Sequence, residues 1–223
     1  MTEQTTDLPA DGGDTPELQS PSLANAVRSA IHRLYSSSSG ESVIEGRGQT
    51  ATRAQLRNAV GRSPEQSLMA WTTVVGKLLP EFPDDWTSTD EPSRQEWAAF
   101  TALTHWAMHQ QAIPSAMHVT AKNRGHNFGH SVGRLAVARN SESTKARFDA
   151  LLLSPGEAST LHHLRSLVQL LRASSISTDY GLLAEDLAAL RRPGGRQRVA
   201  LRWGRGFARG AAAGRAKQPS ETT

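Results

Sequence analysis

The chain has 223 residues, no cysteine and 37% hydrophobic residues, which is enough for one large domain or two small ones with a modest core. Without cysteine it forms neither disulfides nor thiolate zinc sites. The acidic, polar start and the absence of any run of about 18 apolar residues give no sign of a secretory signal or membrane span, so we expect a soluble cytoplasmic protein.

The net charge of +4 conceals an asymmetry between the two ends of the chain. Residues 1–21 contain five acidic residues and no Lys or Arg, so the rest of the chain carries +9. From Arg191 onward there are nine Lys or Arg residues and one acidic residue, Glu221. This basic end favours a polyanionic partner, with nucleic acid first and an anionic membrane surface second. The alternative is a solvated basic tail that binds nothing.

Apolar residues recur at helical spacing along the chain, and there is no convincing two-residue alternation. In chain order, helices are predicted at 22–35, 50–60, 64–79, 93–110, 131–139, 142–153, 156–172, 178–191 and 196–208. The sequence therefore predicts an all-α fold.

Three of these helix starts carry capping signals. Ser63 and Ser154 are each followed by proline and, at the third helical position, by Gln or Glu, while Ser93 with Glu96 repeats the pattern without the proline. In such a box the hydroxyl accepts a backbone N–H of the first turn, and the Glu or Gln side chain accepts the N–H of the cap residue. We therefore expect side-chain caps at all three serines.

Polar and glycine-rich stretches divide the chain into five parts. They are a disordered acidic N-terminal tail (1–21), an N-terminal helical bundle (22–112), a connecting loop (113–130), a C-terminal helical bundle (131–209) and a basic flexible tail (210–223). The two tails contain too little apolar surface to repay the entropy of ordering. The predicted architecture is thus two small helical bundles in one chain.

Two pairs of histidines have the i, i+4 spacing of helical metal ligands. His105 and His109 stand in HWAMH, where tryptophan replaces the glutamate of the H-E-x-x-H metalloprotease motif. His126 and His130 have the same spacing, with His118 upstream as a potential third ligand. Because no acid or cysteine completes either set nearby, we expect surface or packing histidines and no metal site.

Glycines recur at every fourth position in GHNFGHSVGR. Gly125, Gly129 and Gly133 lack the apolar neighbours of a membrane packing motif, and Gly133 is not followed by the Lys of a P-loop. We expect Gly129 to end a loop, and Gly133 to let another helix or a phosphate backbone approach the helix that carries Arg134. The alternative is that Arg134 pairs with an acid inside the fold.

Two common catalytic signatures, the Ser-x-x-Lys pair and the H-R-D loop, are missing from the sequence. Asp179 has the position of a helix start, and Glu185 with Asp186 has the pattern of a solvated face. The sequence therefore predicts no enzyme and no cofactor, although a metal-dependent hydrolase stays open as a third hypothesis.

Arginines form a stripe on each of two predicted helices. In RQRVALRWGRGFARG, four arginines fall on one side of a helix while Val199, Trp203 and Phe207 turn inward; they are Arg198, Arg202, Arg205 and Arg209. A second polar stripe lies opposite a row of leucines and a valine; it consists of His162, Arg165, Gln169 and Arg172. Such stripes suit phosphates spaced along a backbone. With only 5% aromatic residues, sequence-independent backbone contact is favoured over base stacking.

One segment, TRAQLRNAVGRSPEQSLMAW, resembles a helix-turn-helix. In that motif the second helix presents polar side chains to base edges. Here the second helix would begin with Pro64 and Glu65 and then present Trp71, Val74 and Val75, which have the pattern of buried residues. A stand-alone helix-turn-helix regulator is thus the alternative to backbone binding.

Six segments in order resemble the CasB family, the small subunit of the type I-E CRISPR surveillance complex Cascade. They span roughly residues 50–209 and read RAQLRNAVGRSP, TALTHWAMHQQ, SVGRLAVAR, TKARFDALL, HHLRSLVQLLRASSISTDYGLLAEDLAAL and VALRWGRGFAR. The resemblance implies an all-α protein of two small bundles without catalytic activity or cofactor. It also implies assembly as a head-to-tail pair with the other Cascade subunits and guide RNA, and contact with the displaced non-target strand of the DNA and the guide-target duplex.

The resemblance further implies which residues bind nucleic acid. Arg57 matches the basic residue of the family's LRR segment, with Arg53 one turn before it, whereas Asn58 replaces the second arginine of that segment. The other implied residues are Arg134 in the SxGR segment, Lys145 and Arg147 before the Phe, Arg165 in the LR helix, and Arg198 and Arg202 in the terminal helix. The predicted function is a non-catalytic subunit that binds nucleic-acid backbone without sequence specificity and stabilises the R-loop in antiviral defence.

Overall fold

The computed structural model describes residues 22–36, 43–80, 82–83, 86, 90–121, 123 and 125–217. Its α-helices are α1 (Leu23–Ser36), α2 (Val43–Asn58), α3 (Leu68–Thr73), α5 (Arg94–His109), α6 (Phe128–Ala138), α7 (Glu142–Leu152), α8 (Glu157–Ala173), α9 (Tyr180–Leu190) and α10 (Gly195–Arg215). Within these ranges, extended pairing is limited to one isolated bridge between His118 and Thr178. The predicted all-α fold is confirmed, while the expected tail at 1–21 lies outside the described residues.

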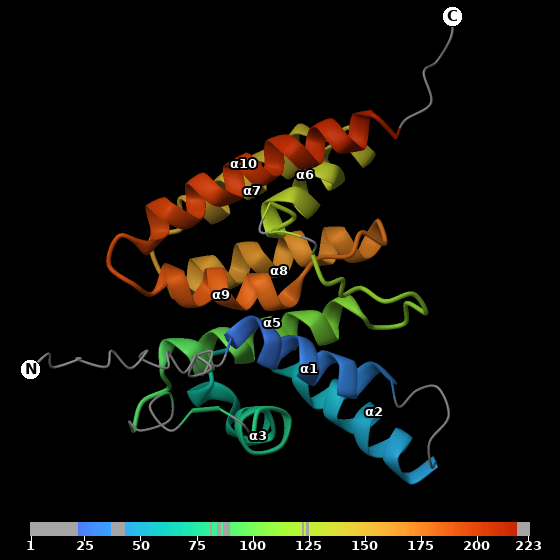
Figure 1. Ribbon diagram of the computed structural model, residues 1–223, viewed down its shortest axis with the longest axis vertical. Helices are drawn as coiled ribbons and strands as arrows, with labels where there is room; N and C mark the ends of the chain where they lie inside the picture. Colours follow the sequence, from blue (N-terminus) through green and yellow to red (C-terminus); the bar gives the residue numbers. More distant parts are fainter. Residues whose placement is uncertain are drawn as a thin grey trace, which may run out of the picture.

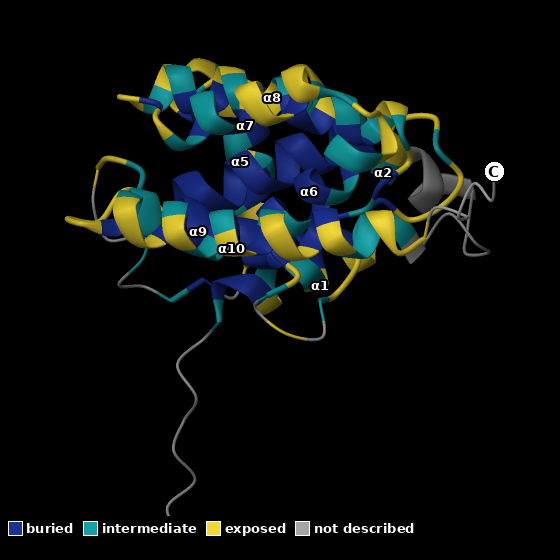
Figure 2. Cartoon of the chain, turned by 90° about the horizontal axis from the view of Figure 1, so that it is seen from above, coloured by how far each residue is buried: buried dark blue, intermediate teal, exposed yellow. Residues whose placement is uncertain are grey.

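Helix α5 lies at the centre of the packing. Its residues from Glu96 to His109 are all buried, because α1, α2, α8 and α9 pack against it. Figure 1 shows α10 with α6 and α7 in one layer, α8 and α9 in the middle, and α5 with α1, α2 and α3 below. In the end-on view of Figure 2, α5 and α6 form the buried centre. None of the described helices is both long and apolar enough to cross a bilayer.

The buried apolar side chains of both halves of the chain form one continuous cluster. Helix α1 packs on α9, and α5 packs on α8 and α9, so elements from the two halves share this core. Burying a large apolar side chain stabilises a fold by about 1.5–3 kcal/mol, and Phe100, Leu103 and Leu164 are fully buried here. The division into two bundles stays a prediction, because no break in the core separates them.

The three predicted caps have three different outcomes. At Ser93 the box is complete, since Oγ accepts the N–H of Glu96 at 3.2 Å and the carboxylate of Glu96 accepts the N–H of Ser93 at 2.8 Å. At Ser63 only the backbone N–H is bound, by Gln66 at 3.1 Å, and a 3₁₀ turn follows. The expected cap at Ser154 is wrong, because its hydroxyl donates back to the carbonyl of Ala150 at 2.9 Å.

Two predicted helices differ from the structure in length or regularity. The segment 64–79 is divided into a 3₁₀ turn at Glu65–Ser67, the short α3, and a π-helical turn at Val74–Leu78. Helix α6 begins at Phe128, three residues before the predicted start, because Asn127 accepts the N–H of His130 at 3.3 Å and caps it.

Glycines allow α6 and α10 to pack backbone against backbone. A Cβ atom added at Gly129 or Gly133 would overlap a backbone carbonyl of α10, and one added at Gly210 would overlap a carbonyl of α6. The expectation that Gly133 admits a close neighbour is confirmed, and the neighbour is a helix. Helix α10 continues to Arg215, whereas the sequence predicts that this helix ends at 208.

We expect Gly133→Ala to lower the free energy of unfolding by about 1–3 kcal/mol, because the added Cβ forces the α10 backbone away. Urea denaturation of the full chain measures this change. Gly204→Ala is the matched control on α10, since nothing lies within 4 Å of its Cβ position, and it should stabilise the helix by up to about 1 kcal/mol. Equal effects of the two substitutions would contradict the close packing.

Candidate nucleic-acid interface

The first of two basic surfaces is formed by α2, α7 and α8. We call it the α2–α8 surface and define it by Arg53, Arg57, Arg147, Arg165 and Arg172. Figure 2 shows α7 and α8 along one side of the molecule and α9 and α10 along the other.

Helix α8 presents its polar stripe outward, as its periodicity predicts. Its apolar row is fully buried and consists of Leu164, Leu167, Val168 and Leu171. Arg165 is therefore exposed, and its side chain passes Gly61 just beyond α2, 3.6 Å from the position of an added Cβ. From α7, Arg147 Nη1 reaches Ser166 Oγ at 3.5 Å, which places it beside the residue that follows Arg165. Arg165 of α8 thus reaches the turn that follows α2, and Arg147 of α7 reaches α8.

The same surface continues to α2 through the last turn of α8. Arg172 donates from Nε and Nη2 to the carbonyl of Gln111 at 3.1 and 2.9 Å. Gln111 in turn lines a cavity of about 680 Å³ together with Arg53 and Arg57. Arg53 Nη2 contacts Thr50 Oγ1 at 3.4 Å, whereas the side chain of Arg57 has no hydrogen bond or ion pair with any residue that the structure describes. Arg57 can therefore offer its guanidinium to a partner.

The second basic surface is a groove along α10, which we call the α10 groove. It has a volume of about 640 Å³ and is lined by Asn123, Gly125, Arg198, Leu201, Arg202, Arg205 and Arg209. The arginine stripe predicted from helical spacing thus lies on one face of α10. Arg198 is exposed and donates to the carbonyl of Pro193 at 3.1 Å.

Within this groove Arg202 has a structural partner. Its Nε donates to Asp186 Oδ1 at 2.9 Å and its Nη2 to the same oxygen, while the indole N–H of Trp203 donates to Oδ2. The expectation that Asp186 lies on a solvated face is wrong, because this side chain is buried between α9 and α10. Burial raises the pKa of Asp186, and the charge of Arg202 opposes that rise. Arg202 thus neutralises an internal charge, and its contact with nucleic acid stays a prediction.

Arg134 is half-buried on α6 and forms no ion pair with any acid in the described ranges. The alternative of an internal ion pair therefore has no support there. The pKa of His130 is lowered to about 4, mainly by burial and in addition by the charges of His126, Arg134 and Arg209. Among the described residues, no acid forms an ion pair with Arg134 or Arg209.

Lys145 is an exposed candidate residue that forms an ion pair with an acid on its own helix. Its Nζ contacts Asp149 Oδ1 at 2.5 Å, one turn further along α7, and lies 5.7 Å from the centre of the Phe207 ring. An exposed pair of this kind contributes less than about 1 kcal/mol to stability. It nevertheless cancels the charge of Lys145 locally, so the structure does not group this lysine with the unpaired arginines.

The histidines of α5 are packing residues, as predicted. His105 Nδ1–H donates to the carbonyl of Thr101 at 2.7 Å, and His109 Nδ1 is 2.8 Å from the hydroxyl of Tyr180. Burial lowers the pKa of both rings to about 4. Nowhere in the described part of the chain do three potential metal ligands come together.

Three arginines of these surfaces are absent from the residues that the family resemblance implied. They are Arg172 on the α2–α8 surface and Arg205 and Arg209 in the α10 groove. Their signal in the sequence was helical spacing alone, since each belongs to an arginine stripe. The family motifs contained no match that would have selected them.

These features define an all-helical protein in which arginines of the described residues line two surfaces. Residues 52–207 match the model of the family described as CRISPR-associated protein Cse2. The chain belongs to this family, the CasB small subunit of type I-E Cascade, and the resemblance found in the sequence is confirmed.

Solved structures agree with this assignment. The crystal structure of CasB from Thermobifida fusca is 27% identical, covers 84% of this chain and 98% of that chain, and has a TM-score of 0.65. M. ruber CasB is 23% identical, with coverages of 86% and 97% and a TM-score of 0.59. A chain of a CRISPR RNA-guided surveillance complex is 23% identical, with coverages of 86% and 96% and a TM-score of 0.58. Curated protein sequences gave no match to this chain.

We expect Arg202→Ala to lower the free energy of unfolding by about 3 kcal/mol, because it leaves the buried carboxylate of Asp186 without its cation. Arg205→Ala is the matched control: it removes the same charge from an exposed neighbour on α10, and we expect a change within about 0.5 kcal/mol. Urea denaturation of both variants measures these changes in the free energy of unfolding. A loss that is small and equal in the two would show that the ion pair contributes little.

We expect the free energy of unfolding to fall as the pH is lowered from about 6.5 to about 4. His105 and His109 bind protons near 6.5 in the unfolded chain but only near 4 in the folded one, so the unfolded state takes up more protons in this window. Above pH 6.5 their contribution is fully present. Because the pKa of His130 is also about 4 in the folded chain, denaturation at several pH values should give a slope of about three protons, and His109→Asn should remove about one. An unchanged slope in that variant would contradict the assignment.

Proposed function

We propose that this chain is a non-catalytic Cascade subunit that binds nucleic-acid backbone without sequence specificity and stabilises the R-loop in antiviral defence. Its partners would be the other Cascade subunits with the guide RNA, the target DNA including the displaced non-target strand, and a second copy of itself. The observation that carries this proposal is the α2–α8 surface, where three helices gather five arginines.

Arginine suits this task for physical reasons. Its planar guanidinium donates to phosphate oxygens in a forked geometry, and each neutralised phosphate releases bound counterions. Exchange of a DNA duplex for a guide-target duplex is nearly balanced in free energy. A few such contacts therefore suffice to favour the open state, and they act equally on every target sequence.

Of the two basic surfaces, the α2–α8 surface is the better candidate for phosphate contact. Arg57 and Arg165 have no ion-pair partner in the described ranges, whereas Arg202 in the α10 groove is held by Asp186. Arg198, Arg205 and Arg209 remain exposed along that groove, and they would form a secondary site.

The alternative of a helix-turn-helix regulator has little support. The segment that would be its recognition helix is interrupted by a 3₁₀ turn and a π-helical turn, and Val74 in its middle is fully buried. A recognition helix must present a continuous row of side chains to base edges, and this segment does not.

We expect Arg57→Ala and Arg165→Ala to shorten the lifetime of the R-loop on a reconstituted complex, by a similar factor for every target sequence. Each should also reduce the log-log salt slope by about 0.7–0.9, the share of one phosphate contact. The lifetime is measured at two salt concentrations. Lys77→Ala, which removes an exposed charge from the π-helical turn, is the control and should leave both values unchanged.

Two results would count against this assignment. A loss that depends on the target sequence would indicate base reading rather than backbone contact. A lifetime that is the same at both salt concentrations would show that phosphate neutralisation is not the source of the stabilisation.

A further inference from the structure

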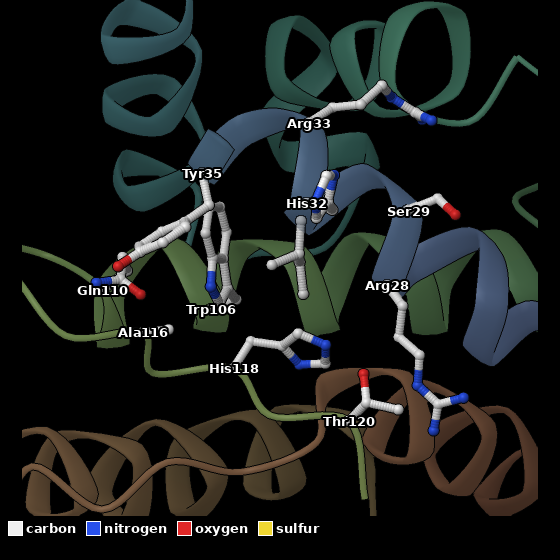
Figure 3. A pocket seen from close by; sticks show the side chains of 11 residues that line it. Arg28, Ser29, His32, Arg33, Tyr35, Trp106, Gln110, Ala116, His118 and Thr120 are labelled. Carbon is white, nitrogen blue, oxygen red and sulfur yellow. The ribbon is translucent and has the colours of Figure 1, made fainter. Parts of the chain in front are cut away.

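A cavity of about 590 Å³ lies between α1, the last turns of α5 and the segment 116–120 (Figure 3). Its wall is apolar for the greater part and includes Ile31 and Ala116. Figure 3 shows four rings around it, those of His32, Tyr35, Trp106 and His118.

Trp106 lines this cavity and carries an unused hydrogen-bond donor. Its side chain is fully buried, and its indole N–H has no acceptor among the described residues. The side chain of the neighbouring Gln110 is already hydrogen-bonded to the segment 113–117. Its Nε2 donates to the carbonyls of Ile113 and Ser115, and its Oε1 accepts the N–H of Met117 at 2.8 Å. A buried donor without a partner costs about 1–3 kcal/mol. An acceptor from a bound partner would remove this cost.

His118 contributes a second donor. Its Nδ1 accepts the backbone N–H of Tyr180 at 3.3 Å, so the proton of the neutral ring is on Nε2. Burial is the main reason that the pKa of His118 is below its ordinary value, and the ring is therefore neutral at pH 7. Two arginines of α1 line the cavity: Arg28 is held by Asp179 at 2.7 Å, and Arg33 donates to the carbonyl of Leu78. The pocket thus favours a ligand that accepts two hydrogen bonds and carries no charge.

The cavity adjoins the one that contains Arg53 and Arg57. Tyr35 and Gln110 line both cavities, so a single layer of side chains separates them. A donor-lined apolar pocket beside a cationic pocket matches the two parts of a nucleotide, the flat neutral base with its ring nitrogen and carbonyl acceptors and the charged phosphate.

We propose that the Trp106 pocket takes a single unpaired nucleobase of a strand whose phosphate lies at Arg53 and Arg57. The donors at Trp106 Nε1 and His118 Nε2 would bind acceptors on the base edge. A base within a duplex already uses that edge for pairing, so the pocket selects a single strand or a base rotated out of its stack. This inference rests on the proposed function, because the strand must first lie along the α2–α8 surface.

The test uses the full chain in a reconstituted complex. The displaced strand of the target carries the fluorescent base 2-aminopurine at one position at a time. We expect the emission to change at one or a few positions, and an abasic site at the same position to shorten the R-loop lifetime about tenfold, the range of one stacked base.

Two matched variants separate the pocket from the loop that carries it. Ala116→Phe fills the pocket from an exposed position, and it should abolish the emission change and the effect of the abasic site while leaving the salt slope intact. Ser115→Phe places the same ring on the adjacent exposed residue outside the pocket and should change neither. Trp106→Phe keeps a ring but removes the donor, and it should weaken the base effect alone.

The outcomes distinguish this inference from the proposed function. If the emission is unchanged at every position while the lifetime stays salt-dependent, the pocket binds no base and the backbone clamp stands. If Ala116→Phe instead prevents the chain from joining the complex, the pocket receives a protein side chain, and the nucleobase inference is wrong. If the chain does not lengthen the lifetime of the R-loop at all, the proposed function itself is wrong.

Discussion

The backbone contact between α6 and α10 determines where the C-terminal arginines lie. Gly129 and Gly133 let the two helices approach until only a glycine fits. That proximity places Trp203 on Phe128, with ring centres 5.4 Å apart, and stacks Phe207 on Phe148 at 5.1 Å. Once these rings are inside, the arginine face of α10 can only point outward. The position of a charged surface thus depends on glycines that carry no charge.

Charge in this protein has two separate uses. Arg28 and Arg202 each neutralise a carboxylate that is buried at one end or one face of α9, Asp179 and Asp186. A carboxylate in such a place requires a cation and several hydrogen bonds, because its removal from water costs several kcal/mol. In the described ranges, the arginines of α2 and α8 form no ion pair with a buried carboxylate. The 25 Lys and Arg residues of the sequence therefore overstate the number of cations that remain for a partner.

The parts of the fold that could be predicted are those determined by local sequence. The apolar row of α8 and the capping box at Ser93 depend on residues within a few turns of each other, and both appear as expected. The burial of Asp186 could not be predicted, because its partners Arg202 and Trp203 come from a different helix. Glu185 and Asp186 look alike in sequence, and only the packing of α10 distinguishes them.

The candidate site follows the same rule. Spacing predicted the stripes on α8 and α10, and a family motif selected Arg57. The cavity beside Arg57 combines α1, the end of α5 and the segment 116–120, and no local pattern joins these three.

Under the proposed function, a surface built this way would let one small helical subunit act on any target. Phosphate contacts from Arg57 and Arg165 would, under the same proposal, supply binding that is independent of sequence, and the strength of these contacts would fall with salt. A neutral pocket next to them adds little discrimination between bases, because two donors find acceptors on more than one base. Such a pocket responds to whether a base is unpaired, which is the property that distinguishes an open R-loop from a closed duplex. Charge would then supply affinity and the pocket would supply selectivity for the open state, with sequence left to the guide.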